Sequence, residues 1–380
     1  MTRIVSLLSL VLFTAFNGYA QPAALVNAKT YFDDKDFEKA KASIDMASSN
    51  EQTSSKEKTW KMKGDIYLAY YTEMEGGIKT QEKLDEILSY YKKAIELDKK
   101  YGYEKEIDKN WSLSQNMYLN EGVSLFNQKK YDEAYKVFLM TISIAEFRGE
   151  TDTLAMYNAG LAAERGGKIS NAIKWYDRCE SVGYKGPGCC AFSIYLHRSI
   201  GEEEEMKKRL AECRTKYPND QNLLTTEINQ HLKEGKLAQV VPLLELSISY
   251  DPNNKHLHYA LGTAHDGLKN FEKAESSYGK AVSIDPNFFD AWYNLGALYF
   301  NTGVDLNNAL TENSDPDVYL AKKKELDEVF KNALSYLEKA HSIKPNDLNT
   351  LESLKQLYAR MDNGTKYAEV DEKIKSIKGN

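Results

Sequence analysis

Proline and cysteine are scarce in this chain, and basic residues are fewer than acidic ones. The 380 residues include 8 prolines, 22 glycines and 4 cysteines, a composition that argues against a long disordered linker. Fifty basic residues stand against 56 acidic ones, so the chain lacks the basic footprint of a nucleic-acid-binding protein. After residue 20, no segment approaches the roughly 18 consecutive apolar residues of a transmembrane helix. We therefore expect a soluble protein that binds neither nucleic acid nor the bilayer core.

The first twenty residues, MTRIVSLLSLVLFTAFNGYA, have the layout of a secretory signal peptide. Arg3 supplies the positive charge, residues 4–16 are an apolar run, and Gly18 and Ala20 are small. We expect cleavage after Ala20 and export of residues 21–380 to the periplasm or beyond the cell. No cysteine lies near the cleavage site, so a lipid anchor of the bacterial lipoprotein type is not indicated.

A spacing of about 34 residues recurs along the chain. Gly262 in "HYALGTAHDG" and Gly296 in "DAWYNLGALY" are separated by one such interval, and Gly160 lies three intervals before Gly262. The same interval separates three prolines, Pro218, Pro252 and Pro286. The segments between them carry apolar and aromatic residues at helical spacing, so each period reads as two helices.

This pattern resembles the tetratricopeptide repeat (TPR) family, whose unit of about 34 residues is a helix–turn–helix. Repeat units begin at Gln21, Glu57, Gln115, Thr153, Pro187, Gln221, Lys255 and Phe289, and a shorter one begins at Leu348. The resemblance implies an all-α fold, a right-handed superhelical solenoid of antiparallel helix pairs with about eight to nine units. It would form a single domain over residues 21–380, with insertions near residues 75–90 and 304–330.

Small residues at the eighth, twentieth and twenty-seventh repeat positions let the two helices of a unit approach each other. In the unit that starts at Lys255 these are Gly262, Ala274 and Ala281, and large side chains fill the gaps around them. The crowded aromatic residues of "DAWYNLGALY" are therefore interpreted as packing residues. The units at Pro187 and Gln221 have Ile194 and Ile228 at the eighth position, and we expect a wider helix pair there.

Two insertions interrupt the period. Eleven extra residues follow the start at Glu57, and 25 follow the start at Phe289. In the second insertion, Asp315 can cap a helix that has Pro316 in its first turn. The stretch from Asp317 to Ile343 then reads as one long helix. These lengthened helices are also candidates for self-association.

The histidines do not require a metal site. His197, His231 and His265 are spaced by the repeat interval and occupy the eleventh repeat position, where other units have tyrosine. Helix axes lie about 8–10 Å apart, whereas zinc ligands sit about 2 Å from the ion. Residues one repeat apart therefore cannot share a zinc ion, and we predict no metal site.

The four cysteines, Cys179, Cys189, Cys190 and Cys213, lie close together in the sequence. Export to an oxidising compartment favours disulfides. Cys189 or Cys190 opens a first helix, and Cys213 ends its antiparallel partner, so these ends should meet. We expect one or two bridges among the four cysteines, and four buried free thiols are the alternative.

The resemblance implies that function lies in a concave groove lined by the first helix of each unit. The groove candidates are Tyr157, Arg165, Tyr195, Arg198, His256, Tyr259, Tyr293, Phe300 and Asn301. Tyrosine and arginine are side chains that anchor interfaces, although aromatic residues at these positions can also finish the packing.

No phosphate loop, serine nucleophile elbow or specific carboxylate pair is present in the sequence, so we predict neither catalysis nor a cofactor. The sequence favours an exported, non-enzymatic scaffold that binds a protein or peptide partner in the cell envelope. The cleavage site before Gln21 resembles those of exported Bacteroidota proteins. The alternative is a glycan-binding module that uses groove tyrosines as stacking platforms.

Overall fold

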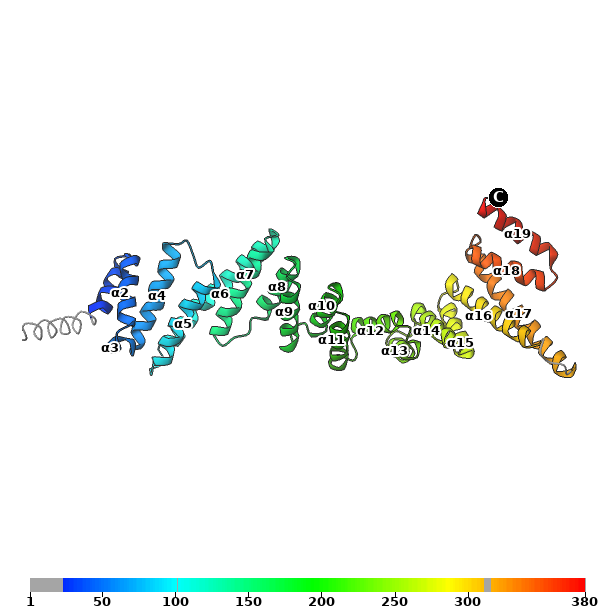
Figure 1. Ribbon diagram of the computed structural model, residues 1–380, viewed down its shortest axis with the longest axis horizontal. Helices are drawn as coiled ribbons and strands as arrows, with labels where there is room; N and C mark the ends of the chain where they lie inside the picture. The colour runs from blue at the N-terminus through cyan, green and yellow to red at the C-terminus, as the bar shows by residue number, and fades with distance from the viewer. Residues whose placement is uncertain (1–22, 101, 311–315, 380) are drawn as a thin grey trace, which may run out of the picture. The chain divides into compact units, whose positions relative to one another are not determined.

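The computed structural model describes residues 23–100, 102–310 and 316–379, and every regular element within them is a helix (Figure 1). Cα packing divides the chain into two compact units, Met1–Cys213 and Arg214–Asn380. The predicted all-α fold of paired helices is confirmed in each unit. The predicted signal peptide and the cap at Asp315 lie outside the described residues.

The first unit begins with a helix over residues 23–33. Its further helices are α2 (Phe37–Ser48), α3 (Glu51–Ser54), α4 (Glu57–Glu73), α5 (Gln81–Leu97), α6 (Tyr103–Asn127), α7 (Tyr131–Phe147), α8 (Thr153–Arg165), α9 (Ile169–Ser181), α10 (Gly186–Ser199) and α11 (Glu203–Lys216), whose last three residues belong to the second unit. Its hydrophobic core is built on Ile44, Ile66, Leu84, Trp111 and Tyr176, all of them buried.

The second unit holds four further helix pairs. They are α12 (Gln221–Lys233) with α13 (Leu237–Tyr250), α14 (Lys255–Gly267) with α15 (Phe271–Ile284), α16 (Phe289–Leu310) with α17 (Pro316–Ile343), and α18 (Leu348–Arg360) with α19 (Gly364–Lys378). Leu244, Tyr278, Leu298, Phe330 and Leu337 lie in its core. Among the described helices of both units, none combines the length and the apolar character that a membrane span needs.

Glycine at the eighth repeat position is explained by one repeated contact. A Cβ atom added at Gly262 would lie 2.5 Å from the ring of Tyr278, and one at Gly160 would lie 2.9 Å from the ring of Tyr176. Each glycine thus receives an aromatic ring that projects from the second helix of its own unit. The predicted close approach of the two helices is confirmed in these units.

The residue that packs on the glycine of the eighth position shows how long each insertion is. Gly64 faces the ring of Tyr91, whereas the interval seen at Gly160 and Gly262 would place its partner at Thr80. That displacement equals the length of the first insertion. Gly296 faces Leu337, a partner that is displaced in the same way by the length of the second insertion.

The helices themselves show where the extra residues go. The long helix predicted from Asp317 to Ile343 is confirmed as α17. The first insertion is shared among α4, α5 and the turn over residues 74–80 between them, and both helices have 17 residues. Both insertions therefore lengthen helices of the repeat and leave the contact at the eighth position intact.

Candidate functional site

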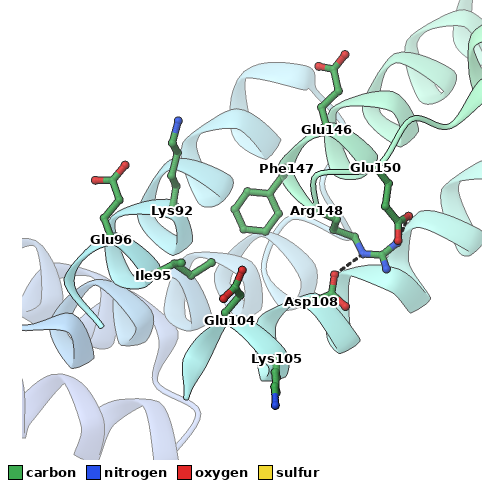
Figure 2. Close-up of a pocket in the computed structure, with 10 residues that line it drawn as sticks. All are labelled: Lys92, Ile95, Glu96, Glu104, Lys105, Asp108, Glu146, Phe147, Arg148 and Glu150. Atoms are coloured by element: carbon green, nitrogen blue, oxygen red, sulfur yellow. Dashed lines mark hydrogen bonds and ion pairs between the residues drawn. The ribbon is translucent and has the colours of Figure 1, made fainter. Parts of the chain in front are cut away.

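A cleft of 750 Å³ opens between α5, α6 and α7 in the first unit (Figure 2). Its lining residues come from the end of α5, the start of α6, and the end of α7 with the turn that follows. They are Lys92, Ile95, Glu96, Glu104, Lys105, Asp108, Glu146, Phe147, Arg148 and Glu150. We call this site the α5–α6–α7 cleft.

The cleft exists because α6 starts at Tyr103, well before the repeat unit that begins at Gln115. One face of this extension is apolar and buried, with Ile107 and Trp111 one helical turn apart. Trp111 packs edge-to-face against Tyr91 of α5, with ring centroids 6.0 Å apart. Glu104 and Asp108 lie on the flank of the helix beside this buried face and form one wall of the cleft.

Asp98 fixes the turn from α5 into α6. Its side-chain oxygens accept hydrogen bonds from the backbone N–H groups of Lys100 (3.0 Å), Gly102 (2.8 Å) and Tyr103 (2.7 Å). The bond from Tyr103 is the main reason that the pKa of Asp98 lies below its ordinary value. The start of α6 is therefore held in place by a charged cap.

Arg148 is the most tightly held side chain of the cleft. Its Nε donates to Asp108 Oδ1 at 2.9 Å, and its Nη1 donates to Gln115 Oε1 at 2.7 Å and to Glu150 Oε2 at 2.8 Å. Figure 2 shows this group at one end of the cleft. These bonds join α6 to the turn after α7, so they hold these two walls of the cleft together.

The centre of the cleft is apolar and its rim is charged. Half-buried Phe147 and Ile95 pack against the core of the first unit. Exposed Lys92, Glu96 and Glu104 surround them, and Glu104 points toward this centre in Figure 2. An apolar centre with a charged rim suits binding of an apolar side chain that has charged neighbours.

In the first unit, the predicted groove residues differ in exposure. Tyr157 is half-buried and contacts the rings of Tyr176, Tyr184 and Phe192, with centroids 5.9–6.3 Å apart. Tyr195 is 60% exposed. Arg165 and Arg198 are also exposed, and Arg198 lies one turn beyond Tyr195 on α10. Of the two predicted tyrosines in this unit, Tyr195 is the more exposed.

In the second unit, the aromatic groove candidates are largely engaged in packing. Tyr259 lies 5.3 Å from Phe288 and its hydroxyl accepts a hydrogen bond from Asn294 at 3.1 Å. Tyr293 stacks on Phe289, and Phe300 packs edge-to-face on Phe330, each with centroids 6.1 Å apart. The remaining candidates, His256 and Asn301, are exposed.

The three histidines at the eleventh repeat position lie in separate helices, α10, α12 and α14. His197 Nδ1 is 2.7 Å from Glu202 Oε2, whereas His265 is buried and burial lowers its pKa. Within the described residues, no three His, Cys, Asp or Glu side chains form a group that could hold a metal ion.

Two of the four cysteines form a disulfide in the structure. Cys190 of α10 is bonded to Cys213 of α11, with Cα atoms 6.1 Å apart. Cys179 and Cys189 are buried free thiols. A hydrogen bond between these two sulfur atoms, together with burial, raises the pKa of the Cys179 thiol.

The sequence did not predict the α5–α6–α7 cleft, because no element was assigned to the residues just before the unit that begins at Gln115. The sequence does contain a signal for the extension of α6. Ile107, Trp111 and Tyr118 lie at the spacing of one helical face, which predicts that α6 begins well before Gln115. The sequence does not show that the far ends of α5 and α7 stand beside this extension.

Comparisons with known proteins find a repeat match in a short part of the chain. A family model described as "TPR repeat" matches residues 268–303. Over 66 residues, which are 17% of this chain, the sequence is 29% identical to anaphase-promoting complex subunit 3 of Schizosaccharomyces pombe. The chain covers only 10% of the length of that relative.

Solved structures with similar helix arrangements include several bacterial proteins. A TPR repeats protein from Bacteroides fragilis shares 23% identity, with 65% of this chain and 98% of that chain covered and a TM-score of 0.31. The C-terminal part of a TPR repeat-containing protein from Cytophaga hutchinsonii shares 14% identity, with 69% and 96% covered and a TM-score of 0.48. MamA shares 18% identity, with 48% and 92% covered and a TM-score of 0.38.

Proposed function

We propose that this TPR repeat protein is an exported, non-enzymatic scaffold that binds a protein or peptide partner in the cell envelope. The α5–α6–α7 cleft is the observation that carries the proposal. Its apolar centre, formed by Phe147 and Ile95, can receive one or two side chains of a peptide. Its rim offers charges of both signs, Lys92 and Glu96 from α5 and Glu104 from α6, which can orient a partner.

Exposed side chains on α10 extend the binding surface in the same unit. Tyr195 and Arg198 are exposed at first-helix positions and belong to the two residue types most enriched among interface anchors. The groove tyrosines of the second unit favour a protein over a glycan, because Tyr259 and Tyr293 are engaged with neighbouring rings. A sugar would need a flat aromatic face that stands free.

In-cell cross-linking of the tagged full-length chain, followed by mass spectrometry of co-purifying proteins, tests the proposal. One variant reverses charge at the cleft rim, Glu96→Lys with Glu104→Lys. A second combines Tyr195→Ala with Arg198→Ala. All four residues are exposed, so both variants should fold. Alanine at half-buried Tyr259, Tyr293 or Phe300 would instead remove core packing and confuse binding with stability.

A matched control reverses a charge far along the sequence, Glu372→Lys on exposed α19. We expect one discrete protein to cross-link to the native chain and to the control, and to be lost or reduced at least fivefold in the cleft variant. Equal recovery of the same proteins with all variants would rule out the cleft as the binding site. Glycan retention without any protein partner would support the glycan-binding alternative.

A further inference from the structure

A second cleft, in the second unit, has a lining that differs in chemistry from the first. It measures 510 Å³ and lies beside α15, α16 and α17. The lining residues are Glu272, Glu275, Ser276, Gly279, Val282, Trp292, Leu295 and Tyr336. We call it the α15–α17 cleft. No groove candidate from the sequence belongs to it.

Aromatic rings form part of its wall. The rings of Trp292 on α16 and Tyr336 on α17 have centroids 5.9 Å apart and are tilted by 32°. The indole N–H of Trp292 donates to the carbonyl of Pro286 at 2.9 Å, which fixes the ring. Both side chains are half-buried, so part of each remains accessible. Trp292 packs against the core of the second unit, and it also lines this cleft.

Negative charge completes the lining. Glu272 is exposed on α15, and Glu275, one turn further on, accepts a hydrogen bond from the hydroxyl of Tyr299. None of the eight lining residues is basic. An aromatic wall beside carboxylates attracts cations in two ways, through the ring quadrupole and through direct ion pairing. Buried Val282 and Leu295 supply apolar contact at the base.

Gly279 keeps the cleft open at a cost to helix stability. It lies within α15, where glycine is less favourable than alanine by roughly 1 kcal/mol. A Cβ atom added at Gly279 would meet nothing within 4 Å, in contrast to Gly262, which a ring covers. Within the described residues no side chain covers Gly279, so its backbone is open to close approach by a ligand.

We propose that the α15–α17 cleft binds a positively charged side chain, arginine or lysine, of a partner protein. The alkyl stem lies over Val282 and Leu295. The charged end lies against the rings of Trp292 and Tyr336 and pairs with Glu272. This site is separate from the α5–α6–α7 cleft, and its test does not require the natural partner.

Saturation-transfer NMR with the full-length chain tests this proposal with acetyl-Gly-Arg-Gly-amide as the probe. The same peptide with citrulline in place of arginine is the control, because citrulline keeps the shape and loses the charge. We expect binding of the arginine peptide and at least a tenfold weaker response to the citrulline peptide. Choline is the third probe, and it represents a small free ammonium compound.

Protein variants locate the binding. Glu272→Gln should weaken it about two- to fivefold, as expected for an exposed ion pair. Gly279→Leu should fill the cleft and abolish binding, and circular dichroism melting would verify that this variant folds. Glu325→Gln, at an exposed position on α17 outside the lining, should change nothing.

Two kinds of result would overturn the proposal. Equal responses to the arginine and citrulline peptides would remove the cation as the recognised group, and so would binding unaffected by both Glu272→Gln and Gly279→Leu. Binding of choline without binding of the arginine peptide would assign the cleft to a small ligand in place of a partner side chain. None of these results bears on partner capture through the first unit.

Discussion

At the residue scale, glycine has two opposite roles within a single helix pair. Gly262 on α14 lies under the ring of Tyr278, whereas Gly279 on α15 faces open space. The first glycine allows two helices to approach closely, and the second leaves a cleft unfilled. Both glycines lie in helices, so replacing either one with alanine should stabilise its helix by the same intrinsic amount, roughly 1 kcal/mol. Any difference between them therefore measures tertiary contact.

We expect the same substitution to have opposite effects at these two positions. Gly262→Ala places a methyl group against the buried Tyr278 ring, and the overpacking, about 1–3 kcal/mol, should exceed the helix gain. Gly279→Ala should raise the unfolding free energy by about 0.5–1 kcal/mol. Urea unfolding followed by circular dichroism measures both. Equal effects of the two substitutions would mean that the ring contact does not limit packing.

His265 should make the second unit sensitive to mild acid. Its side chain is 3% exposed and its Nδ1 has no hydrogen-bond partner in the described part of the chain. Burial is the main cause of its lowered pKa, and Lys273 adds to it, against a smaller opposing effect of Glu245. Below about pH 6.5 His265 is protonated in the unfolded chain, whereas its lowered pKa keeps it neutral to a lower pH in the folded chain. Stability is therefore present above that pH and is lost as pH falls below it.

His265→Leu should reduce this dependence. We expect the melting temperature of the native chain to drop between pH 7.5 and pH 5.5, and the variant to lose less over the same interval. His256→Gln, at an exposed position, serves as the control and should behave like the native chain. A pH dependence that is identical in all three proteins would contradict the prediction. The pKa of His341 is also lowered, chiefly by burial. His265→Leu should therefore remove only part of the pH dependence of the melting temperature.

At the element scale, the disulfide joins a helix pair that lacks the close glycine contact. The pair α10 and α11 has Ile194 where five other units have glycine, and the bond between Cys190 and Cys213 closes a loop of 23 residues. Cross-linking a loop of this size stabilises a fold by about 3 kcal/mol through the unfolded state. A covalent link thus supplements packing in this pair.

Replacing both bonded cysteines, Cys190→Ser with Cys213→Ser, should therefore lower the unfolding free energy by about 2–4 kcal/mol. Cys179→Ala with Cys189→Ala is the control that keeps the disulfide. Thiol titration of the native chain in denaturant should find two free thiols. Four free thiols in protein isolated from its own compartment would show that the bond does not form there.

The extension of α6 shows how an element acquires a role beyond the repeat. Its buried stripe, Ile107 and Trp111, ties it to the core of the first unit, and Asp98 caps its start. Glu104 and Asp108, on the flank beside this stripe, then form one wall of the α5–α6–α7 cleft. The long helices α16 and α17 are a second such elaboration, and self-association through them stays a prediction.

At the scale of the whole molecule, the proposed site of action depends on export. The layout of residues 1–20 supports this proposal. If the leader is removed after Ala20, the purified native protein begins at Gln21, and intact-mass spectrometry measures the change directly. Cell fractionation should place the shortened chain outside the cytoplasm. A full-length chain confined to the cytoplasm would disprove export, while leaving partner binding open to its own test.

The repeat period by itself determined the all-α fold and the register of the helix pairs. The reason is local, because the eighth position must be small wherever a ring from the second helix packs on it. Gly64, Gly160 and Gly262 each lie under a tyrosine ring of the second helix, and Gly296 lies under Leu337, so the close approach is kept across both insertions. Helical periodicity and close packing act over one or two helices, so they can be read from one sequence.

Only the tertiary structure decided which side chains are free and where clefts open. Tyr157 and Tyr195 both occupy predicted groove positions, yet the first packs against three rings and the second is 60% exposed. The two clefts depend on side chains from three helices each, some of them far apart in the chain. Exposure and concavity are properties of several helices together, so periodicity within one helix cannot determine them.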